Sequence, residues 1–213
     1  MNKESGDMRS SDHKRIANFL FEVGTMRKLP RMHRQTLLTN DMSDNIATHS
    51  FRVAVIAWFL AKMETIDPYK TLMMALFHDM AEVRTGDHNW VHKRYVKEYE
   101  DDVREEQLGS LPFPEIKALA DEYEERKTRE AIVAKDADLL DQVLLLREYE
   151  WQGNKEAAVW LHGKKNEALG RDAGAGNRQL EKLQTDSAKK LGEDIYETPP
   201  SDWWNNLWTD EKK

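Results

Sequence analysis

Cysteine is absent from this 213-residue chain, and signals for β-strands are nearly absent as well. Without cysteine the chain has no disulfides, no thiolate metal sites and no cysteine nucleophile, and it suits a reducing compartment, so we expect a cytoplasmic protein. The sequence has no sustained alternation of polar and apolar residues and no Asn-Gly or Asp-Gly hairpin turn between β-branched runs. A fold built on a sheet is therefore excluded.

Long hydrophobic runs are lacking too. The longest, Val53 to Ala61, is too short to cross a bilayer and is flanked by Arg52 and Lys62, so it indicates a buried helix and we expect no membrane partner. The polar residues 1–11 show no secretory signal, and we expect them to be flexible. A net charge of −7 argues against nucleic acid as a partner, because such binding depends on neutralising phosphates.

What is present indicates one soluble, all-α domain. The chain is 39% hydrophobic and 33% charged, the composition of an ordinary globular protein, and its length suits a single core. We expect a helical core over residues 12–198 and a tail over residues 199–213. The tail carries Trp203, Trp204 and Trp208, which form either a platform for a nucleobase or apolar anchors for the terminus, and we favour anchors.

Apolar residues spaced three and four apart predict most of the helices. The predicted helices cover residues 12–25, 45–63, 68–86, 90–108, a segment from 115, 128–151, 155–169 and 178–191. Asp44 is the expected N-cap of the second helix, and Asp67 with Pro68 starts the third, which Gly86 ends. The glycine-rich loop over residues 170–176 predicts a linker rather than a phosphate cradle, because no strand precedes it.

The third predicted helix carries the first candidates for chemistry. At 100° per residue, His78, Asp79 and Glu82 fall on one face beside apolar residues. An ordinary surface pair of His78 with Glu82 is one interpretation. The neighbouring run of residues 72–77 is apolar, however, so the helix is expected to be buried, where a divalent cation is one efficient partner for charged groups.

Two further residues extend this set. His49 lies in the first turn of the predicted helix 45–63, and Asp138 lies within the apolar run of the predicted helix 128–151. Each alone is typical of a hydrogen-bonded core residue. Together with His78 and Asp79 they make two imidazoles and two carboxylates, a mixture that suits manganese, iron, cobalt, nickel or zinc.

His49, the adjacent pair His78-Asp79, and Asp138 resemble the HD-domain superfamily of metal-dependent phosphohydrolases. The stretch over residues 77–87, Phe-His-Asp-Met-Ala-Glu-Val-Arg-Thr-Gly-Asp, resembles the branch that contains the 5′-deoxynucleotidases. This resemblance implies an all-helical HD-domain bundle, usually a homodimer. It further implies hydrolysis of the 5′-phosphate of (deoxy)nucleoside monophosphates by attack of a metal-bound water.

The resemblance also implies roles for single residues. His49, His78, Asp79 and Asp138 would hold one divalent ion, of manganese, cobalt, magnesium, iron, nickel or zinc. Glu82 would orient or deprotonate the water, and Asp87 would lie beside the sugar and the leaving group. Asp136 and Asp141 compete with Asp138, which matches the family's ligand position when residues are counted back from Glu148 to Glu150.

The basic run over residues 27–34 is the densest available for a substrate phosphate, with Arg31 and Arg34 as the candidates. A solvated loop is an equally good interpretation of this run. The chain departs from the deoxynucleotidases here, because they carry a tryptophan that senses the 2′ position of the sugar and this chain has Met32, His33 and Arg34. Ala47-Thr48 also stands where an acidic residue commonly precedes the histidine ligand.

Three other functions remain open from the sequence. The first is hydrolysis of nucleoside triphosphates or alarmones, as in other HD-domain branches, although more basic segments would then be expected. A binding module with a structural metal is the second, but it leaves Glu82 without a purpose. An oxygenase with a second iron is the third, and only His88 and His92 lie near enough to be its extra ligands.

Overall fold

The computed structural model describes residues 9–162, 165–166, 171–172, 180–205 and 207, and these are overwhelmingly helical. The prediction of an all-α fold is confirmed, with one addition: two-residue strands pair antiparallel after α9. The elements are α1 (Ser10–Val23), η1 (Met26–Lys28), α2 (His33–Thr36), α3 (Ile46–Met63), α4 (Pro68–Phe77), α5 (Glu82–Thr85), η2 (His92–Arg94), α6 (Glu100–Leu108), α7 (Glu115–Glu125), α8 (Arg129–Trp151), α9 (Lys155–His162), β1 (Lys165–Asn166), β2 (Arg171–Asp172), α11 (Asp186–Glu197) and α12 (Asp202–Asn205).

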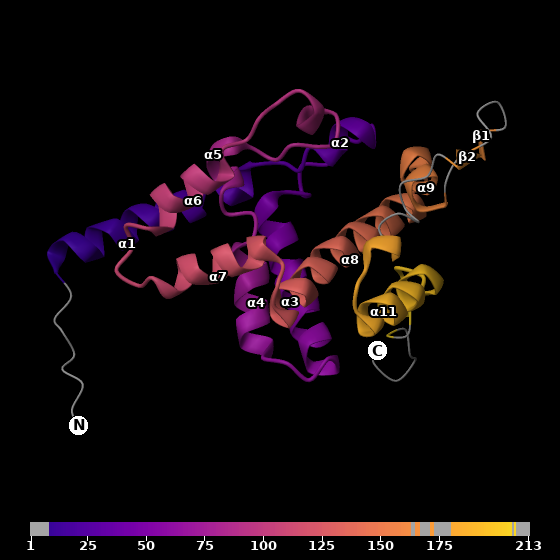
Figure 1. Cartoon of the computed structure of the whole chain (residues 1–213). Coiled ribbons are helices and arrows are strands. Elements are labelled where there is room, and N and C mark those ends of the chain that lie inside the picture. Colours follow the sequence, from indigo (N-terminus) through magenta and orange to yellow (C-terminus); the bar gives the residue numbers. More distant parts are fainter. Residues whose placement is uncertain (1–8, 163–164, 167–170, 173–179, 206, 208–213) are drawn as a thin grey trace.

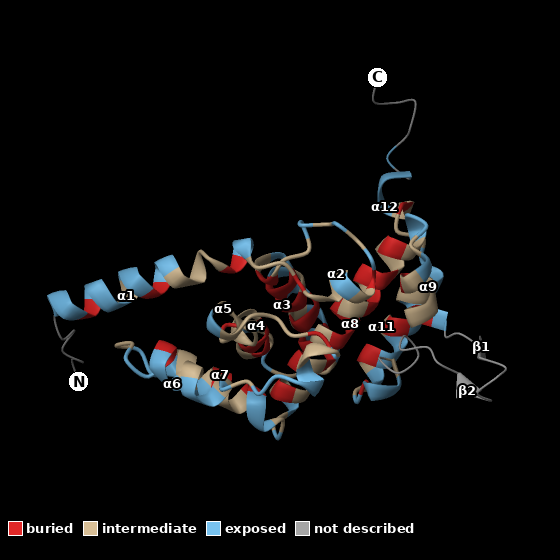
Figure 2. Cartoon of the chain, turned by 90° about the horizontal axis from the view of Figure 1, so that it is seen from above, coloured by how far each residue is buried: buried red, intermediate tan, exposed pale blue. Residues whose placement is uncertain are grey.

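The centre of the bundle is formed by α3, α4 and α8, with α7 and α11 packed around them (Figure 1). Buried residues run along α3 and α8, where the two helices face each other (Figure 2). By length and composition α3 is the one helix of the described residues that could cross a membrane. In this fold, Val53, Ala57 and Leu60 of α3 are instead fully buried in the main hydrophobic core.

The helix starts follow local capping chemistry. Asn45, and not the expected Asp44, caps α3: its side chain accepts from the N–H of Thr48, and the Thr48 hydroxyl accepts in turn from the N–H of Asn45. The residue before His49 is therefore part of a capping box. Asp67 and Pro68 begin α4 as predicted, and Thr128 caps α8.

The prediction of one helix over residues 68–86 is wrong, because α4 ends at Phe77 and α5 starts only at Glu82. In a continuous α-helix the carbonyl of Met80 would accept a hydrogen bond from the backbone N–H of the residue four positions later, Arg84. Here Gln107 of α6 donates to that carbonyl at 3.2 Å, and the N–H of Val83 approaches it at 3.3 Å, a tighter turn. The chain thus follows tighter turns between Phe77 and Glu82, and the carbonyl of Met80 also accepts from α6.

Other boundaries also differ from the predictions. The expected helix over residues 90–108 is the short η2 and then α6, and the expected helices 155–169 and 178–191 appear as α9 and α11. Residues 10 and 11, expected to be flexible, are the start of α1. Residues 1–8, the loop residues 173–176 and Trp208 lie outside the described residues. The side chain of Trp203 is 70% exposed, which does not support its role as an apolar anchor.

Candidate metal and phosphate site

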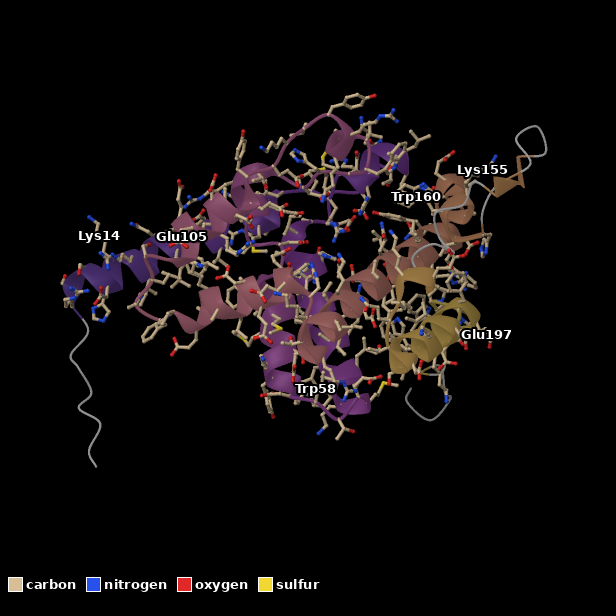
Figure 3. The ribbon with its side chains drawn as sticks, viewed as in Figure 1. Lys14, Trp58, Glu105, Lys155, Trp160 and Glu197 are labelled. Atoms are coloured by element: carbon tan, nitrogen blue, oxygen red, sulfur yellow. The ribbon has the colours of Figure 1, made fainter. Side chains whose placement is uncertain are left out.

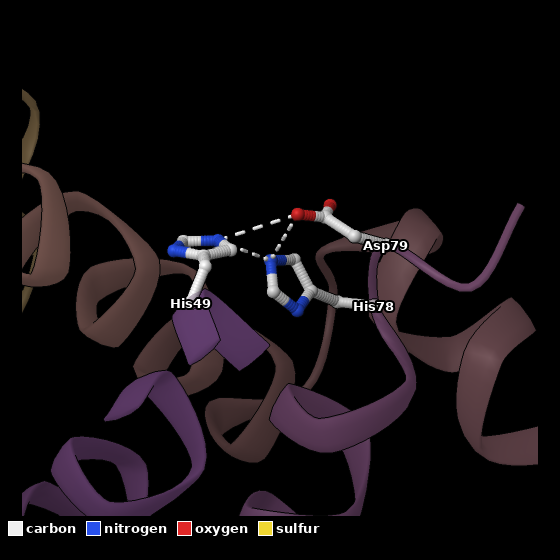
Figure 4. A group of neighbouring side chains, drawn as sticks. All are labelled: His49, His78 and Asp79. Carbon is white, nitrogen blue, oxygen red and sulfur yellow. Dashed lines mark hydrogen bonds and ion pairs between the residues drawn. The ribbon is translucent and has the colours of Figure 1, made fainter. Parts of the chain in front are cut away.

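Side chains from three separate parts of the bundle converge at one point. His49 comes from the first turn of α3, and His78 and Asp79 come from the turn after α4 (Figure 4). Their ligand atoms all lie within 4.8 Å of one another, and His49 Nε2 is 3.2 Å from His78 Nε2. Ligands bound at about 2.0–2.2 Å to one tetrahedral ion are spaced by about 3.4 Å, so this arrangement fits a single metal ion.

Both imidazoles are fixed by their far nitrogens. Nδ1 of His78 lies 2.7 Å from the carbonyl oxygen of Ala75, and Nδ1 of His49 lies 2.6 Å from a carboxylate oxygen of Asp141. A carbonyl and an ionised carboxylate can only accept, so each Nδ1 carries the hydrogen. In the neutral rings both Nε2 lone pairs therefore face the same point, as in histidines that bind metals.

Asp138 of α8 lies beside this group of three side chains. Its Oδ1 lies 3.3 Å from His49 Nε2 and 3.8 Å from His78 Nε2, while its Oδ2 accepts from Lys135 at 2.6 Å. The two competing aspartates have other partners. Asp136 is fully buried and accepts from the start of the α11 segment at Gln184 and Thr185, and Asp141 is bonded to His49.

The site favours negative charge on its carboxylates. Burial alone would raise the pKa of Asp79, but the charge and hydrogen bonds of His78 and His49, when these rings are protonated in the metal-free protein, hold it well below its ordinary value. Burial likewise opposes ionisation of Asp138, and Lys135 and the same imidazoles lower its pKa well below the usual range. The ionised carboxylates of Asp79 and Asp138, both largely buried, would attract a cation.

Glu82 lies at the start of α5. The sequence predicted it one helical turn beyond His78 on the same helix, but the helix is interrupted between the two residues. Its Oε2 is buried and has no hydrogen-bond partner among the described residues. Burial, and then the charges of Asp79 and Asp87, raise the pKa of Glu82 well above its ordinary value. A buried carboxyl group that has an unpaired oxygen and lies beside candidate metal ligands is suited to accepting or donating a proton.

The structure separates the two arginines proposed for a phosphate. Arg31 is only 7% exposed, and burial by itself would lower the pKa of its guanidinium. The negative charges of four nearby carboxylates outweigh burial and raise this pKa; they belong to Asp79, Asp87, Asp138 and Glu82. Arg34 lies elsewhere, with its guanidinium against the sulfur of Met42. Of these two arginines, Arg31 therefore lies at the same site as the side chains that could hold a metal ion.

The loop that carries Arg31 is tied to the loop after α5. Asp87 accepts from the N–H of Met32, and Asn89 donates to the carbonyl of Met32 at 2.9 Å and to Gln35 at 2.9 Å. Asp87 thus makes a structural bond to the loop that carries Arg31. Asn89 is 1% exposed and was missed by sequence reasoning, because a lone asparagine in a loop gives no signal of such a bond.

Arg52 is a second missed residue. It pairs with Asp141, the carboxylate behind His49, and its Nη1 lies 2.6 Å from Glu148. Its position three residues after His49 is a signal that helical spacing could have provided. The arginine therefore fixes the carboxylate that fixes His49.

A cavity of about 180 Å³ opens beside the cluster, between the turn after α4 and the helices α6 and α7. His78, Asp79 and Glu82 form one end of it. Two of its basic side chains already have acidic partners, Arg104 with Asp121 at 2.9 Å and Lys135 with Asp138. The cavity therefore gives access to Glu82, and part of its positive charge is already neutralised.

The oxygenase interpretation gains no support. His88 Nδ1 is bonded to Glu98, and the rings of His88 and His92 pack edge to face at 5.6 Å. Among the described residues, the group of side chains spaced to hold an ion consists of His49, His78 and Asp79.

The comparisons with known proteins agree with this geometry. The model of a family described as the HD domain matches residues 26–176. A 5′-deoxynucleotidase of Dictyostelium discoideum is 32% identical over 125 residues, which are 53% of this chain and 66% of that protein. A 5′-deoxynucleotidase of Erwinia tasmaniensis is 30% identical over 145 residues, covering 61% of this chain and 73% of that protein.

Solved structures show the same architecture. A protein of Pyrococcus horikoshii superposes with a TM-score of 0.65 at 28% identity, covering 85% of this chain and 96% of that one. A predicted metal-dependent phosphohydrolase of Magnetospirillum magnetotacticum gives a TM-score of 0.62 at 22% identity over 88% of this chain and 92% of that one, which shows a shared fold alone.

Proposed function

The chain belongs to the HD domain family, and on that premise we propose that it is a metal-dependent phosphohydrolase that releases the 5′-phosphate of (deoxy)nucleoside monophosphates. One observation carries this proposal: two fixed imidazoles and two ionised carboxylates converge beside a buried arginine. Relatives in two distant organisms are named 5′-deoxynucleotidases, which supports the same reaction.

We assign His49, His78, Asp79 and Asp138 as the residues that hold one divalent ion, chosen among manganese, cobalt, magnesium, iron, nickel and zinc. The borderline nitrogens and hard oxygens of these ligands suit this group of metals. When bound, such an ion would lower the pKa of a coordinated water towards about 7 and polarise phosphoryl oxygens.

The chain's own residues supply the remaining parts. Arg31 offers a buried guanidinium to the phosphate, whose charge a guanidinium matches with two parallel hydrogen bonds. Glu82 accepts a proton at Oε2, the oxygen that has no partner among the described residues. Asp87, beside the arginine loop, faces the sugar and the leaving group.

Monophosphates fit this site better than triphosphates or alarmones. Among the described residues, Arg104 and Lys135 at the cavity are already paired with Asp121 and Asp138, and Arg31 is a buried cation whose charge the carboxylates of the site favour. Deoxynucleoside monophosphates are the first substrates to test, since the relatives act on deoxynucleotides by name.

The deciding experiment measures phosphate release from nucleoside mono-, di- and triphosphates, with manganese, cobalt, magnesium or zinc added in turn. We expect release from monophosphates only with added metal. His78→Ala and Asp79→Ala should lose bound metal and activity together while circular dichroism shows unchanged helicity. Full metal occupancy in both variants would overturn the ligand assignment.

We also propose a homodimer that forms through α3. Its outer face carries Phe51, Val55, Phe59 and Met63, spaced four residues apart and all more than 36% exposed, as a continuous apolar stripe. Phe59→Glu should convert the dimer to a monomer in light scattering while leaving the helicity unchanged. A monomer of the unmodified chain at micromolar concentration would contradict this assembly. The lack of cysteine supports a cytoplasmic location.

A further inference from the structure

Arg31 is held in an unusual way for a buried arginine. Its Nη2 lies 3.2 Å from Nε2 of His33, and its Nε is buried without a hydrogen-bond partner among the described residues. Four carboxylates lie near enough to raise its pKa, yet its side-chain hydrogen bond in the described structure is to an imidazole.

The protonation of His33 follows from its neighbours. A guanidinium has donors and no acceptor, so Nε2 of His33 must accept from Arg31, and the ring hydrogen sits on Nδ1. Nε2 of Gln142 approaches the same ring nitrogen at 3.2 Å, which places the amide of Gln142 as a second donor. Burial and the charge of Arg31 lower the pKa of His33 to about 4, which agrees with a neutral ring.

The ring of His33 is also fixed in space. Trp160 of α9, which is labelled in Figure 3, packs against it edge to face, with the ring centroids 5.8 Å apart. His33 starts α2, whose preceding residue is tied by Asp87 and Asn89 to the opposite loop. The imidazole is thus anchored from α8, α9 and the loop after α5.

We propose that His33 is a positioning residue that orients the guanidinium of Arg31 towards the substrate phosphate. This inference rests on the proposed phosphohydrolase function. A carboxylate in the same place would hold the arginine more strongly, but it would also neutralise it and compete with the phosphate. A neutral imidazole orients Arg31 and leaves its full charge for the substrate.

The test begins with two variants of the metal-loaded protein. His33→Phe keeps the ring and its packing on Trp160 but removes the acceptor, whereas His33→Gln offers an amide oxygen close to the position of Nε2. We expect His33→Phe to raise KM for the nucleoside monophosphate about tenfold or more, the worth of one hydrogen bond to a charged group, with a smaller change in kcat. His33→Gln should recover most of the loss.

A double-mutant cycle shows whether His33 acts through Arg31. In an Arg31→Ala background, His33→Phe should change kcat/KM by less than about threefold, because the group that it positions is gone. His162→Phe, the same replacement at an exposed histidine of α9, is the control and should behave as the unmodified protein. An equal loss from His33→Phe in both backgrounds, or no rescue by glutamine, would overturn the proposal.

Calorimetric titration with inorganic phosphate separates this inference from the proposed reaction. The metal-loaded protein should bind phosphate, His33→Phe should weaken the binding about tenfold, and His33→Gln should restore it. If nucleoside monophosphates are not hydrolysed, the proposed function fails and the phosphate titration alone decides the role of His33. Unaltered phosphate affinity in His33→Phe, or no binding by the unmodified protein, would refute that role.

Discussion

Replacing Glu82 by glutamine separates a proton acceptor from a structural residue, since the amide has nearly the same size as the carboxylate. Glu82 is not one of the four residues assigned as metal ligands, so the variant should keep its full metal content. If Oε2 accepts a proton during the reaction, turnover should fall by two to four orders of magnitude, or about 3–5 kcal/mol of transition-state stabilisation. KM should change little, or fall, as repulsion between the carboxylate and the phosphate is relieved.

The same variant has a second signature in the metal-free protein. Burial, Asp79 and Asp87 raise the pKa of Glu82 in the folded chain above its ordinary value of 4.5, so ionising it costs folding free energy. This cost is absent below pH 4.5 and grows as the pH rises above it. With a chelator present at neutral pH, Glu82→Gln should therefore have a higher Tm than the unmodified chain, and the difference should vanish in acid.

Metal stoichiometry, Tm and turnover must be measured on one preparation. Near-normal turnover with full metal would refute the role of Glu82 in the chemistry. A lower Tm with normal turnover in the folded fraction would instead make Glu82 structural and contradict the reasoning from its pKa.

The remaining predictions concern the surroundings of the cluster. Asp141→Asn should weaken metal binding about tenfold in a chelator competition, because it removes the negative charge that is hydrogen-bonded to His49. Glu148→Gln is the control and should not weaken it, since Glu148 contacts Arg52 rather than His49. Asp136→Ala should lower the free energy of unfolding in urea by about 3 kcal/mol, since buried donors lose their acceptor, while the metal content stays complete; loss of metal would make Asp136 a ligand. Arg31→Met should raise KM at least tenfold and Arg34→Met should leave it unchanged, and equal effects would contradict their separation.

Much of the site was visible in the sequence because each feature depends on local residue identity. The adjacent His78-Asp79 pair, with His49 and Asp138 in apolar helical segments, gave the cluster that the structure brings together. The fold class followed from helical spacing. The ligand position on α8 could not be decided from spacing alone, because Asp136, Asp138 and Asp141 all lie in the same apolar run.

What the sequence could not predict depends on contacts between distant segments. No proline or glycine between residues 69 and 85 marks a helix end, whereas in the folded chain α4 ends at Phe77 and Gln107 donates to the carbonyl of Met80. Arg31 and Arg34 look equivalent in a basic run, yet one is buried in the site and the other lies on Met42. The bond of Asn89 to the arginine loop likewise exists only once the two loops meet.

The spacing of the aspartates on α8 makes this helix intolerant of insertions and deletions. Asp136 holds the start of the α11 segment, Asp138 faces the cluster and Asp141 supports His49, so one helix serves three neighbours in three directions. One residue gained or lost between Asp136 and Asp138 rotates everything beyond it by about 100°. Such a change would turn Asp138 and Asp141 away from His49 together, whereas many single substitutions in α8 would affect one neighbour at a time.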